Sequence, residues 1–155
     1  AGALADWLAS VVPLPAEVAQ APQRFAPGTV YLAPDDRHLV VAGPGHLGLA
    51  PNSAEDRYCP SADRLFASAA RVYGARAIGV ILTGMGDDGA QGLASMRAAG
   101  ALTLAQDEAS SVVYGMPRAA VEAGAVVRSA PLAALPLAVL AALRHRAPGA
   151  ARGAP

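Results

Sequence analysis

Residues 77–89 have the sequence AIGVILTGMGDDG, in which an unbroken apolar run leads into a loop of glycine and aspartate. An apolar run without alternation is typical of a strand that is buried on both faces of a sheet. Residues 90–99 are then expected to form a helix that Gly100 stops, and residues 101–105 to form a second buried strand. This order of elements predicts an α/β fold with a doubly wound, mostly parallel sheet and helices on both faces.

Shorter elements are expected on both sides of this unit. Upstream, the sequence predicts a helix over 3–10, an extended piece near 17–19, a strand over 29–32, a β-hairpin over 38–42 and 46–50, and a helix over 62–73. Ser61 is the expected N-cap of that helix. Downstream, the sequence predicts a short helix over 117–123, a short strand over 125–127 and a last helix over 132–144.

Length and composition exclude several classes of protein. The chain has 155 residues, which suits one domain and is too short for a (β/α)₈ barrel of about 200 residues or more. Its net charge of zero gives no case for a nucleic-acid footprint, so no nucleic-acid partner is expected. All twelve basic residues are Arg, which excludes phosphate loops and nucleophiles that depend on Lys. The single cysteine, Cys59, has no internal disulfide partner, which favours a reducing, cytoplasmic compartment.

The most hydrophobic stretch, residues 129–143, is about 15 residues long and contains two prolines. A membrane-spanning helix needs roughly 18 to 20 apolar residues. We therefore expect this stretch to be a helix of the core, without membrane insertion.

The glycine loop has more than one interpretation from its pattern. The spacing GxGxxG of a dinucleotide-binding loop is satisfied by Gly84, Gly86 and Gly89. Asp107 follows about 20 residues later, where such a fold binds a ribose hydroxyl. However, Asp87 and Asp88 stand where a pyrophosphate would need bare backbone N–H groups, and two carboxylates would repel it. An oxidoreductase, a plain helix cap and a catalytic aspartate all remain possible at this point.

Four motifs resemble those of the chemotaxis protein-glutamate methylesterases. Residues 80–89, VILTGMGDDG, resemble the family sequence VILTGMGxDG, and residues 105–118, AQDEASSVVYGMPR, resemble AQxEASSVVYGMPR. Residues 30–39, VYLAPDDRHL, are similar to VYIAPGDxHL, and residues 60–66, PSADRLF, are similar to part of RPSVDxLF. The motifs occur in the family's order and cover most of residues 27–140.

The resemblance implies a doubly wound α/β enzyme that hydrolyses glutamyl methyl esters on methyl-accepting chemoreceptors, often with deamidation of glutamines. The family uses a Ser-His-Asp triad and no metal or cofactor. Asp88 matches the triad aspartate, whose role is to orient the histidine and stabilise its imidazolium form. By the same resemblance, the loop residues Gly84, Met85 and Gly86 lie near the oxyanion.

The family's other two triad members have no counterpart in this sequence. The serine belongs to an ASTGG-like turn and the histidine to an HMP-like motif, and neither motif is present. The resemblance thus implies a partial catalytic domain over 1–145, with N-terminal strands missing, an open sheet edge and a flexible tail over 146–155. An upstream segment or a receiver domain is an expected partner. We expect the 155 residues alone to lack esterase activity, and an inactive remnant or partner-binding module is the alternative.

No other side chain is expected to replace the missing members. The histidines are better explained as loop, strand-end or helix-end residues, and they are His38, His46 and His145. Ser110 and Ser111 lack the GxSxG elbow of a nucleophile and are expected to be turn or cap residues. Tyr58 and Cys59 stand where the family often has His and Arg, so contacts made by that loop are expected to differ.

Overall fold

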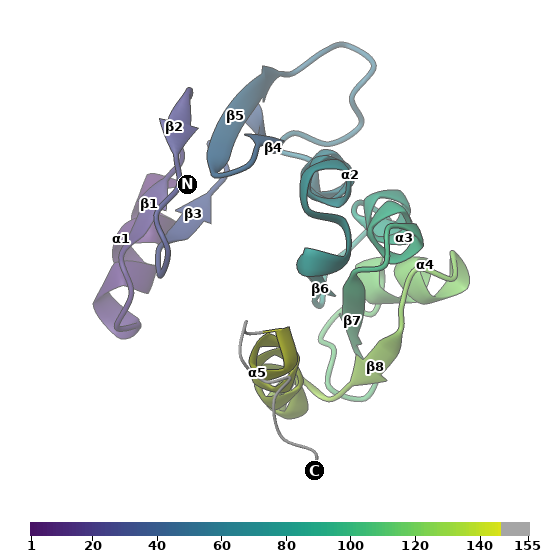
Figure 1. The fold of residues 1–155 in the computed structure, drawn as a ribbon. Coiled ribbons are helices and arrows are strands. Elements are labelled where there is room, and N and C mark those ends of the chain that lie inside the picture. Colours follow the sequence, from purple (N-terminus) through teal and green to yellow (C-terminus); the bar gives the residue numbers. More distant parts are fainter. Residues whose placement is uncertain (147–155) are drawn as a thin grey trace.

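The computed structural model describes residues 1–146 and arranges five α-helices around three small sheets (Figure 1). The elements in chain order are α1 (Gly2–Val11), β1 (Ala16–Val18), β2 (Gln23–Arg24), β3 (Val30–Leu32), β4 (Arg37–Gly43), β5 (His46–Pro51), α2 (Ala62–Tyr73), η1 (Gly74–Arg76), β6 (Ile78–Ile81), α3 (Ala90–Ala98), β7 (Leu102–Gln106), α4 (Met116–Glu122), β8 (Arg128–Ala130), η2 (Leu132–Ala134) and α5 (Leu135–Arg146). The two η elements are short 3₁₀ helices.

The sheet that carries the predicted site is parallel and has the strand order β6-β7-β8. Helices α3 and α4 cover one face of this sheet and α5 lies against the other, as Figure 1 shows. Helix α2 packs beside α3, on the side toward the β-hairpin. The prediction of a parallel α/β sheet with helices on both faces is therefore confirmed.

Alternation along β6 explains how the two faces are filled. Ile81 belongs to the buried cluster under α3, whereas Ile78 and Val80 pack with Leu104 of β7 on the α5 face. Gly79 lies on the α3 face, where an added Cβ would come within 2.5 Å of Leu93 Cδ1. A glycine is needed at this position because the side chains of α3 approach the backbone of β6 closely there.

The predicted hairpin is present as β4 and β5, and it joins α2 rather than the parallel sheet. The amide of Val41 donates to Ser68 Oγ at 2.9 Å, and the amide of Gly45 donates to the Tyr73 hydroxyl at 2.8 Å. Strand β2 adds a third strand to the hairpin, and β1 and β3 form a separate parallel pair. The two-residue β2 was not predicted, because its pairing with β5 rather than its own sequence makes it a strand.

Two boundaries near the C-terminus differ from expectation. The predicted strand over 125–127 is wrong, since the strand is β8 at Arg128–Ala130. Ala125 is fully buried, and its amide donates to the Ala120 carbonyl of α4. It is therefore apolar because it packs at the end of α4, not because it lies in a strand. The last α-helix, predicted over 132–144, is α5 from Leu135 to Arg146, and the 3₁₀ helix η2 precedes it. Residues 147–155 of the predicted tail over 146–155 lie outside the described residues.

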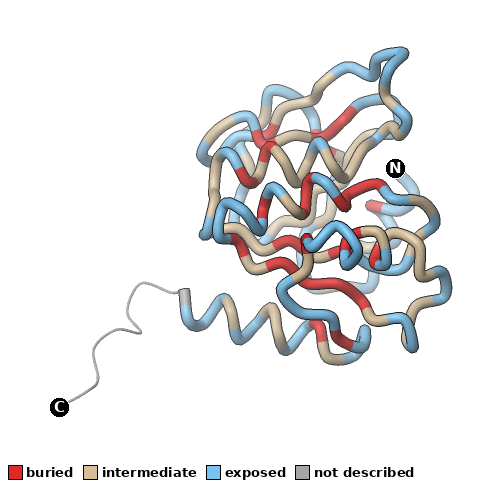
Figure 2. Tube along the Cα trace, turned by 90° about the vertical axis from the view of Figure 1, so that its right-hand side faces the viewer, coloured by how far each residue is buried: buried red, intermediate tan, exposed pale blue. Residues whose placement is uncertain are grey.

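Strand β6 is an edge strand: among the described residues its outer side has no partner strand. Leu82, just beyond it, is 44% exposed. Buried residues are most frequent in β7 and α3, and the exposed stretches lie at the outside of the chain trace (Figure 2). The predicted open edge is thus present in the described part. Over the same residues, no helix has the length and apolar character needed to cross a membrane.

Candidate active site

A cleft of about 980 Å³ lies at the carboxyl end of β6, where α/β sheets collect functional groups. Three segments line it: residues 55–64 before and within α2, residues 85–91 after β6, and residues 113–123 leading through α4. Asp88 is among the lining residues. The candidate that the sequence singled out, Asp88, therefore lies in this cleft.

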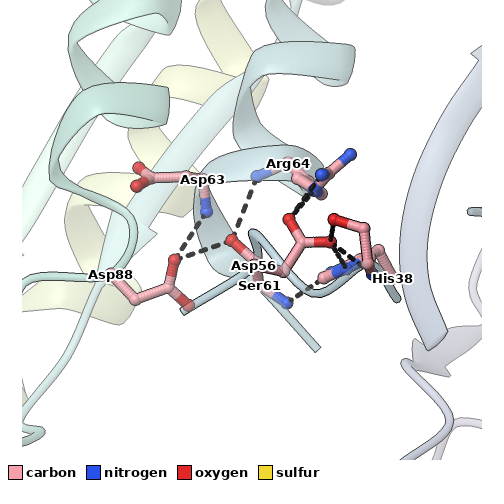
Figure 3. Close-up of polar contacts among 7 residues, drawn as sticks. His38, Asp56, Ser61, Asp63, Arg64 and Asp88 are labelled. Carbon is pink, nitrogen blue, oxygen red and sulfur yellow. Dashed lines mark hydrogen bonds and ion pairs between the residues drawn. The ribbon is translucent and has the colours of Figure 1, made fainter. Parts of the chain in front are cut away.

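The Asp88 carboxylate is 9% exposed and is held by the first turn of α2 (Figure 3). Its Oδ1 accepts hydrogen bonds from Ser61 Oγ at 2.8 Å and from the Asp63 amide at 3.1 Å. Its Oδ2 accepts one from the Ala62 amide at 2.7 Å. A helix N-terminus has unpaired N–H groups, and two of them donate to this carboxylate. Asp88 is consequently held in a fixed orientation as a hydrogen-bond acceptor.

Gly89 brings the carboxylate to this position. Its φ of +91° is a left-handed conformation that favours glycine, and it turns the chain between Asp88 and α3. An added Cβ would lie 3.1 to 3.2 Å from Ile81, Ala62 and Phe66. Strand β6, α2 and α3 therefore converge on the loop, which explains why Asp88 meets α2 and not the helix that follows it.

Asp63 connects the two helices behind the carboxylate. Its amide binds Asp88, and its own Oδ1 accepts the Gly92 amide of α3 at 2.6 Å. Burial raises the pKa of Asp63, and the nearby negative charge of Asp88 adds to that rise. The contacts with α3 amides act in the opposite direction and favour the charged form.

One wall of the cleft is made by joining the loops that follow β6 and β7. Thr83 and Val113 exchange two hydrogen bonds, at 2.8 and 3.1 Å. The Gly84 carbonyl accepts the amides of Gly115 and Met116 at 3.1 and 2.9 Å. An added Cβ on Gly84 would lie 2.5 Å from Met116 Sδ. Gly84 therefore holds the two loops together, and it is not among the residues that line the cleft.

The other two residues expected near an oxyanion do line the cleft. Met85 is 86% exposed, and Gly86 has a φ of +97°. An added Cβ on Gly86 would lie 2.7 Å from the Tyr58 hydroxyl, so Tyr58 covers this glycine. The structure places Met85 and Gly86 beside Asp88, and the assignment of an oxyanion site to them remains a proposal.

Arg57 and Tyr58 are site residues that the sequence did not identify. Arg57 Nη1 contacts both oxygens of Asp87, at 3.1 and 3.0 Å, and the Tyr58 hydroxyl donates to Asp87 Oδ1 at 2.9 Å. These contacts, the Tyr58 hydrogen bond first, hold the pKa of Asp87 below its usual value. The hydrogen bond to Asp87 raises the pKa of Tyr58. The one available signal was that Tyr58 departs from the family motif.

Replacing Tyr58 by Phe is expected to raise the pKa of Asp87 toward its ordinary value. The variant removes a donor to the charged form while the ring remains, and Arg57 still contacts the carboxylate. A carboxyl whose pKa is lowered by folding stabilises the protein above its unfolded pKa, and this stabilisation is lost as the pH falls through the folded pKa. The stability difference between wild type and variant should therefore be present at neutral pH and disappear in acid.

The measurement is a ¹³C NMR titration of the Asp87 carboxyl. Tyr31→Phe is the matched control, because the Tyr31 hydroxyl accepts from the Ala26 amide and has no contact with the cleft. An Asp87 titration that is the same in Tyr58→Phe and wild type would show that the hydrogen bond has no influence on it.

No histidine lines the cleft within residues 1–146. His38 is fully buried and uses both ring nitrogens, on Asp56 and on the Ser61 amide. His46 lies beside the hairpin turn, with Nδ1 2.9 Å from the Pro44 carbonyl, and His145 is exposed in the last turn of α5. The interpretation of these side chains as structural, rather than as a catalytic base, agrees with the geometry.

The remaining candidates also make structural contacts. Ser110 Oγ donates to Asp107 Oδ1 at 2.6 Å and Ser111 Oγ donates to the Asp107 carbonyl at 2.7 Å, as expected for turn residues. The ribose-binding role considered for Asp107 is disfavoured, because its carboxylate already accepts both the amide and hydroxyl of Ser110. Tyr58 over Gly86 also blocks the close backbone approach that a pyrophosphate needs.

No group of three or more His, Cys, Asp or Glu side chains in the described part is arranged to hold a metal ion.

Comparisons with known proteins agree with this geometry. A model of the CheB methylesterase family matches residues 1–139. Protein-glutamate methylesterase/protein-glutamine glutaminase 3 of Myxococcus xanthus strain DK1622 is 46% identical over 134 residues, which are 86% of this chain and 37% of that protein. Protein-glutamate methylesterase FrzG of Myxococcus xanthus is 48% identical over 137 residues, 88% of this chain and 41% of its own length. The chain thus spans about two fifths of these relatives.

A solved structure shows the same fold. The crystal structure of the Thermotoga maritima CheB methylesterase catalytic domain superposes with a TM-score of 0.83 at 32% identity, over 90% of this chain and 75% of that one. A quarter of the Thermotoga chain therefore has no counterpart here. The family match, the identities and the superposition together show that the chain belongs to the CheB methylesterase family.

Proposed function

We propose that this chain supplies the aspartate, Asp88, of a Ser-His-Asp methylesterase that hydrolyses glutamyl methyl esters on chemoreceptors. The observation that carries the proposal is the carboxylate itself, which three donors hold in a cleft at the carboxyl end of a parallel strand. The relatives support the substrate class, because they are named protein-glutamate methylesterases.

The open edge of β6 supports a site completed by further strands. Parallel strands in one sheet bring their carboxyl ends to the same edge, so loops that follow strands added beside β6 would lie next to residues 83–89. Serine and histidine on such loops would come close to Asp88. We propose that these two residues come from a segment outside the 155 residues, with a receiver domain as a further partner.

The proposed mechanism assigns each group one role. The serine hydroxyl attacks the ester carbonyl carbon while its proton passes to the histidine, which then protonates the departing methanol. Water hydrolyses the acyl-enzyme by the reverse sequence and leaves a free glutamate. Asp88 holds the imidazole tautomer and stabilises its charged form. Its Oδ2 accepts only the Ala62 amide among the described residues and can receive the imidazole N–H.

The chain's own loop supplies the proposed oxyanion region through the backbone near Met85 and Gly86, with Gly84 fixing that loop. Deamidation of glutamine follows the same path, with ammonia leaving in place of methanol, and the relatives' second name supports it. We also propose a cytoplasmic location, which agrees with a single cysteine.

The test joins this chain to the part of Myxococcus xanthus FrzG outside the matched 137 residues, which is expected to carry the serine and the histidine. It measures methanol released from a methylated receptor peptide. We expect turnover by the joined protein and none by the 155 residues alone. Esterase turnover by the chain alone would contradict the proposed division of the triad. A joined protein that is folded but inactive would favour the alternative, an inactive remnant that binds a partner.

A further inference from the structure

His38 is a buried titratable side chain for which the proposed mechanism has no use. It is the second residue of β4, it is 0% exposed, and it lies beside the first turn of α2 (Figure 3). Its Nδ1 lies 3.1 Å from the Ser61 amide nitrogen, and its Nε2 lies 3.2 Å from Asp56 Oδ2. A fully buried imidazole with both nitrogens engaged holds its neighbours in fixed places.

The partners determine which nitrogen carries the proton. A backbone amide can only donate, so Nδ1 of His38 accepts from Ser61 and bears no hydrogen. Nε2 carries the proton and donates to Asp56. Asp56 in turn is paired with Arg64 and accepts from Ser53, and these contacts, Arg64 first, hold the pKa of Asp56 well below its usual value. His38 is thereby anchored to a charged carboxylate.

Ser61 links His38 to the carboxylate of Asp88. Its amide binds His38, and its hydroxyl donates to Asp88 Oδ1 at 2.8 Å. The other two donors to Asp88 are the next two amides, those of Ala62 and Asp63. All three donors thus come from one short segment, and the first residue of that segment is held by the imidazole.

We propose that His38 is a positioning residue for Asp88: its Nδ1 fixes the Ser61 peptide, and residues 61–63 then fix the carboxylate. His38 has no contact with Asp88 and does not line the cleft, so it is not a catalytic residue. The hydrogen bond between the Ser61 amide and His38 stands on the geometry alone. Its effect on turnover rests on the proposed function.

Two substitutions separate the two ring nitrogens. In His38→Asn, the amide oxygen can take the place of Nδ1 and accept from Ser61, while the contact with Asp56 is lost. In His38→Gln, the longer side chain can reach Asp56 in place of Nε2, while the acceptor for Ser61 is lost. Asn fills less of the buried space of the ring than Gln does, so a purely structural role would make His38→Asn the more disturbed variant. Loss of the acceptor for Ser61 predicts the opposite order.

The measurement is amide hydrogen exchange by NMR on the 155-residue chain, which needs no enzymatic activity. We expect His38→Gln to speed exchange at Ser61, Ala62 and Asp63 by about tenfold, as for the loss of one hydrogen bond. We expect His38→Asn to remain close to wild type at these amides. Arg71, in the last turn of α2, is the internal control and should be unchanged in both variants.

Acceleration spread along α2 that is equal in both variants, or larger in His38→Asn, would overturn the proposal and leave His38 a core residue. A second measurement applies to the wild-type chain if either variant fails to fold. A long-range ¹H–¹⁵N spectrum at neutral pH should show Nδ1 of His38 without a proton, and a proton on Nδ1 would overturn the proposal. In the joined enzyme, His38→Gln should lower kcat more than His38→Asn, with KM unchanged.

Discussion

Replacing Asp88 by Asn is expected to lower ester hydrolysis by the joined enzyme about 10⁴-fold, the loss typical of removing the carboxylate from a Ser-His-Asp triad. The amide keeps the size of the side chain but has only one acceptor oxygen. If that oxygen accepts from Ser61 and Asp63, the amide nitrogen faces the Ala62 N–H, 2.7 Å from the present Oδ2. The same nitrogen would then offer a donor to the imidazole, which would favour the wrong tautomer.

The readout is methanol release over a range of substrate concentrations, from which kcat and KM are determined separately. The loss should fall on kcat, because the carboxylate acts on the transition state and not on substrate binding. Asp36→Asn is the matched control: Asp36 is exposed and lies outside the cleft, so its removal should leave turnover unchanged. A decrease of less than tenfold in Asp88→Asn would mean that Asp88 is not the triad aspartate.

The unbroken run over 77–82 predicted β6 correctly because burial on two faces acts on every residue of a strand. The same reasoning failed for β8. Ala125 and Val126 pack against the core under α3 and α4. They are apolar because the loop between α4 and β8 is buried there, not because they form a strand. The exposed Arg128 and Ser129 are strand residues only because they pair with Leu104 and Ala105 of β7. This pairing depends on β7, which lies more than 20 residues earlier, so the sequence around 128–130 does not predict it.

In the site too, the sequence predicted the features that depend on neighbouring residues and missed those that depend on distant ones. The motif placed Asp88 after a buried strand, and the structure agrees. The donors to its carboxylate come from residues 61–63, more than 20 positions earlier, and only the packing of α2 against α3 brings them together. Arg57 and Tyr58 lie in a loop without periodicity, so their contact with Asp87 could not be predicted from pattern.

Gly92 is the point where α2 and α3 approach each other closely. An added Cβ there would lie 2.5 Å from the Asp63 carbonyl oxygen and 2.8 Å from both Asp63 Cα and Phe66 Cβ. Two of these three atoms are backbone atoms of a packed helix and have little freedom to move. The Gly92 amide also donates to Asp63 Oδ1 at 2.6 Å, so the same contact supports the residue whose amide binds Asp88.

Gly92→Ala is therefore expected to lower the free energy of unfolding by about 1–3 kcal/mol, the usual cost of overpacking. Alanine by itself favours a helix over glycine by about 1 kcal/mol, so a loss of stability would show that the steric term is larger. Urea unfolding at neutral pH measures it. Gly2→Ala is the matched control, since Gly2 is also helical and an added Cβ there meets no atom within 4 Å. That variant should be neutral or slightly more stable. If Gly92→Ala were as stable as Gly2→Ala, α2 and α3 would have to be farther apart than the structure places them. The N-terminus of α2 could then not be held against Asp88 through Asp63.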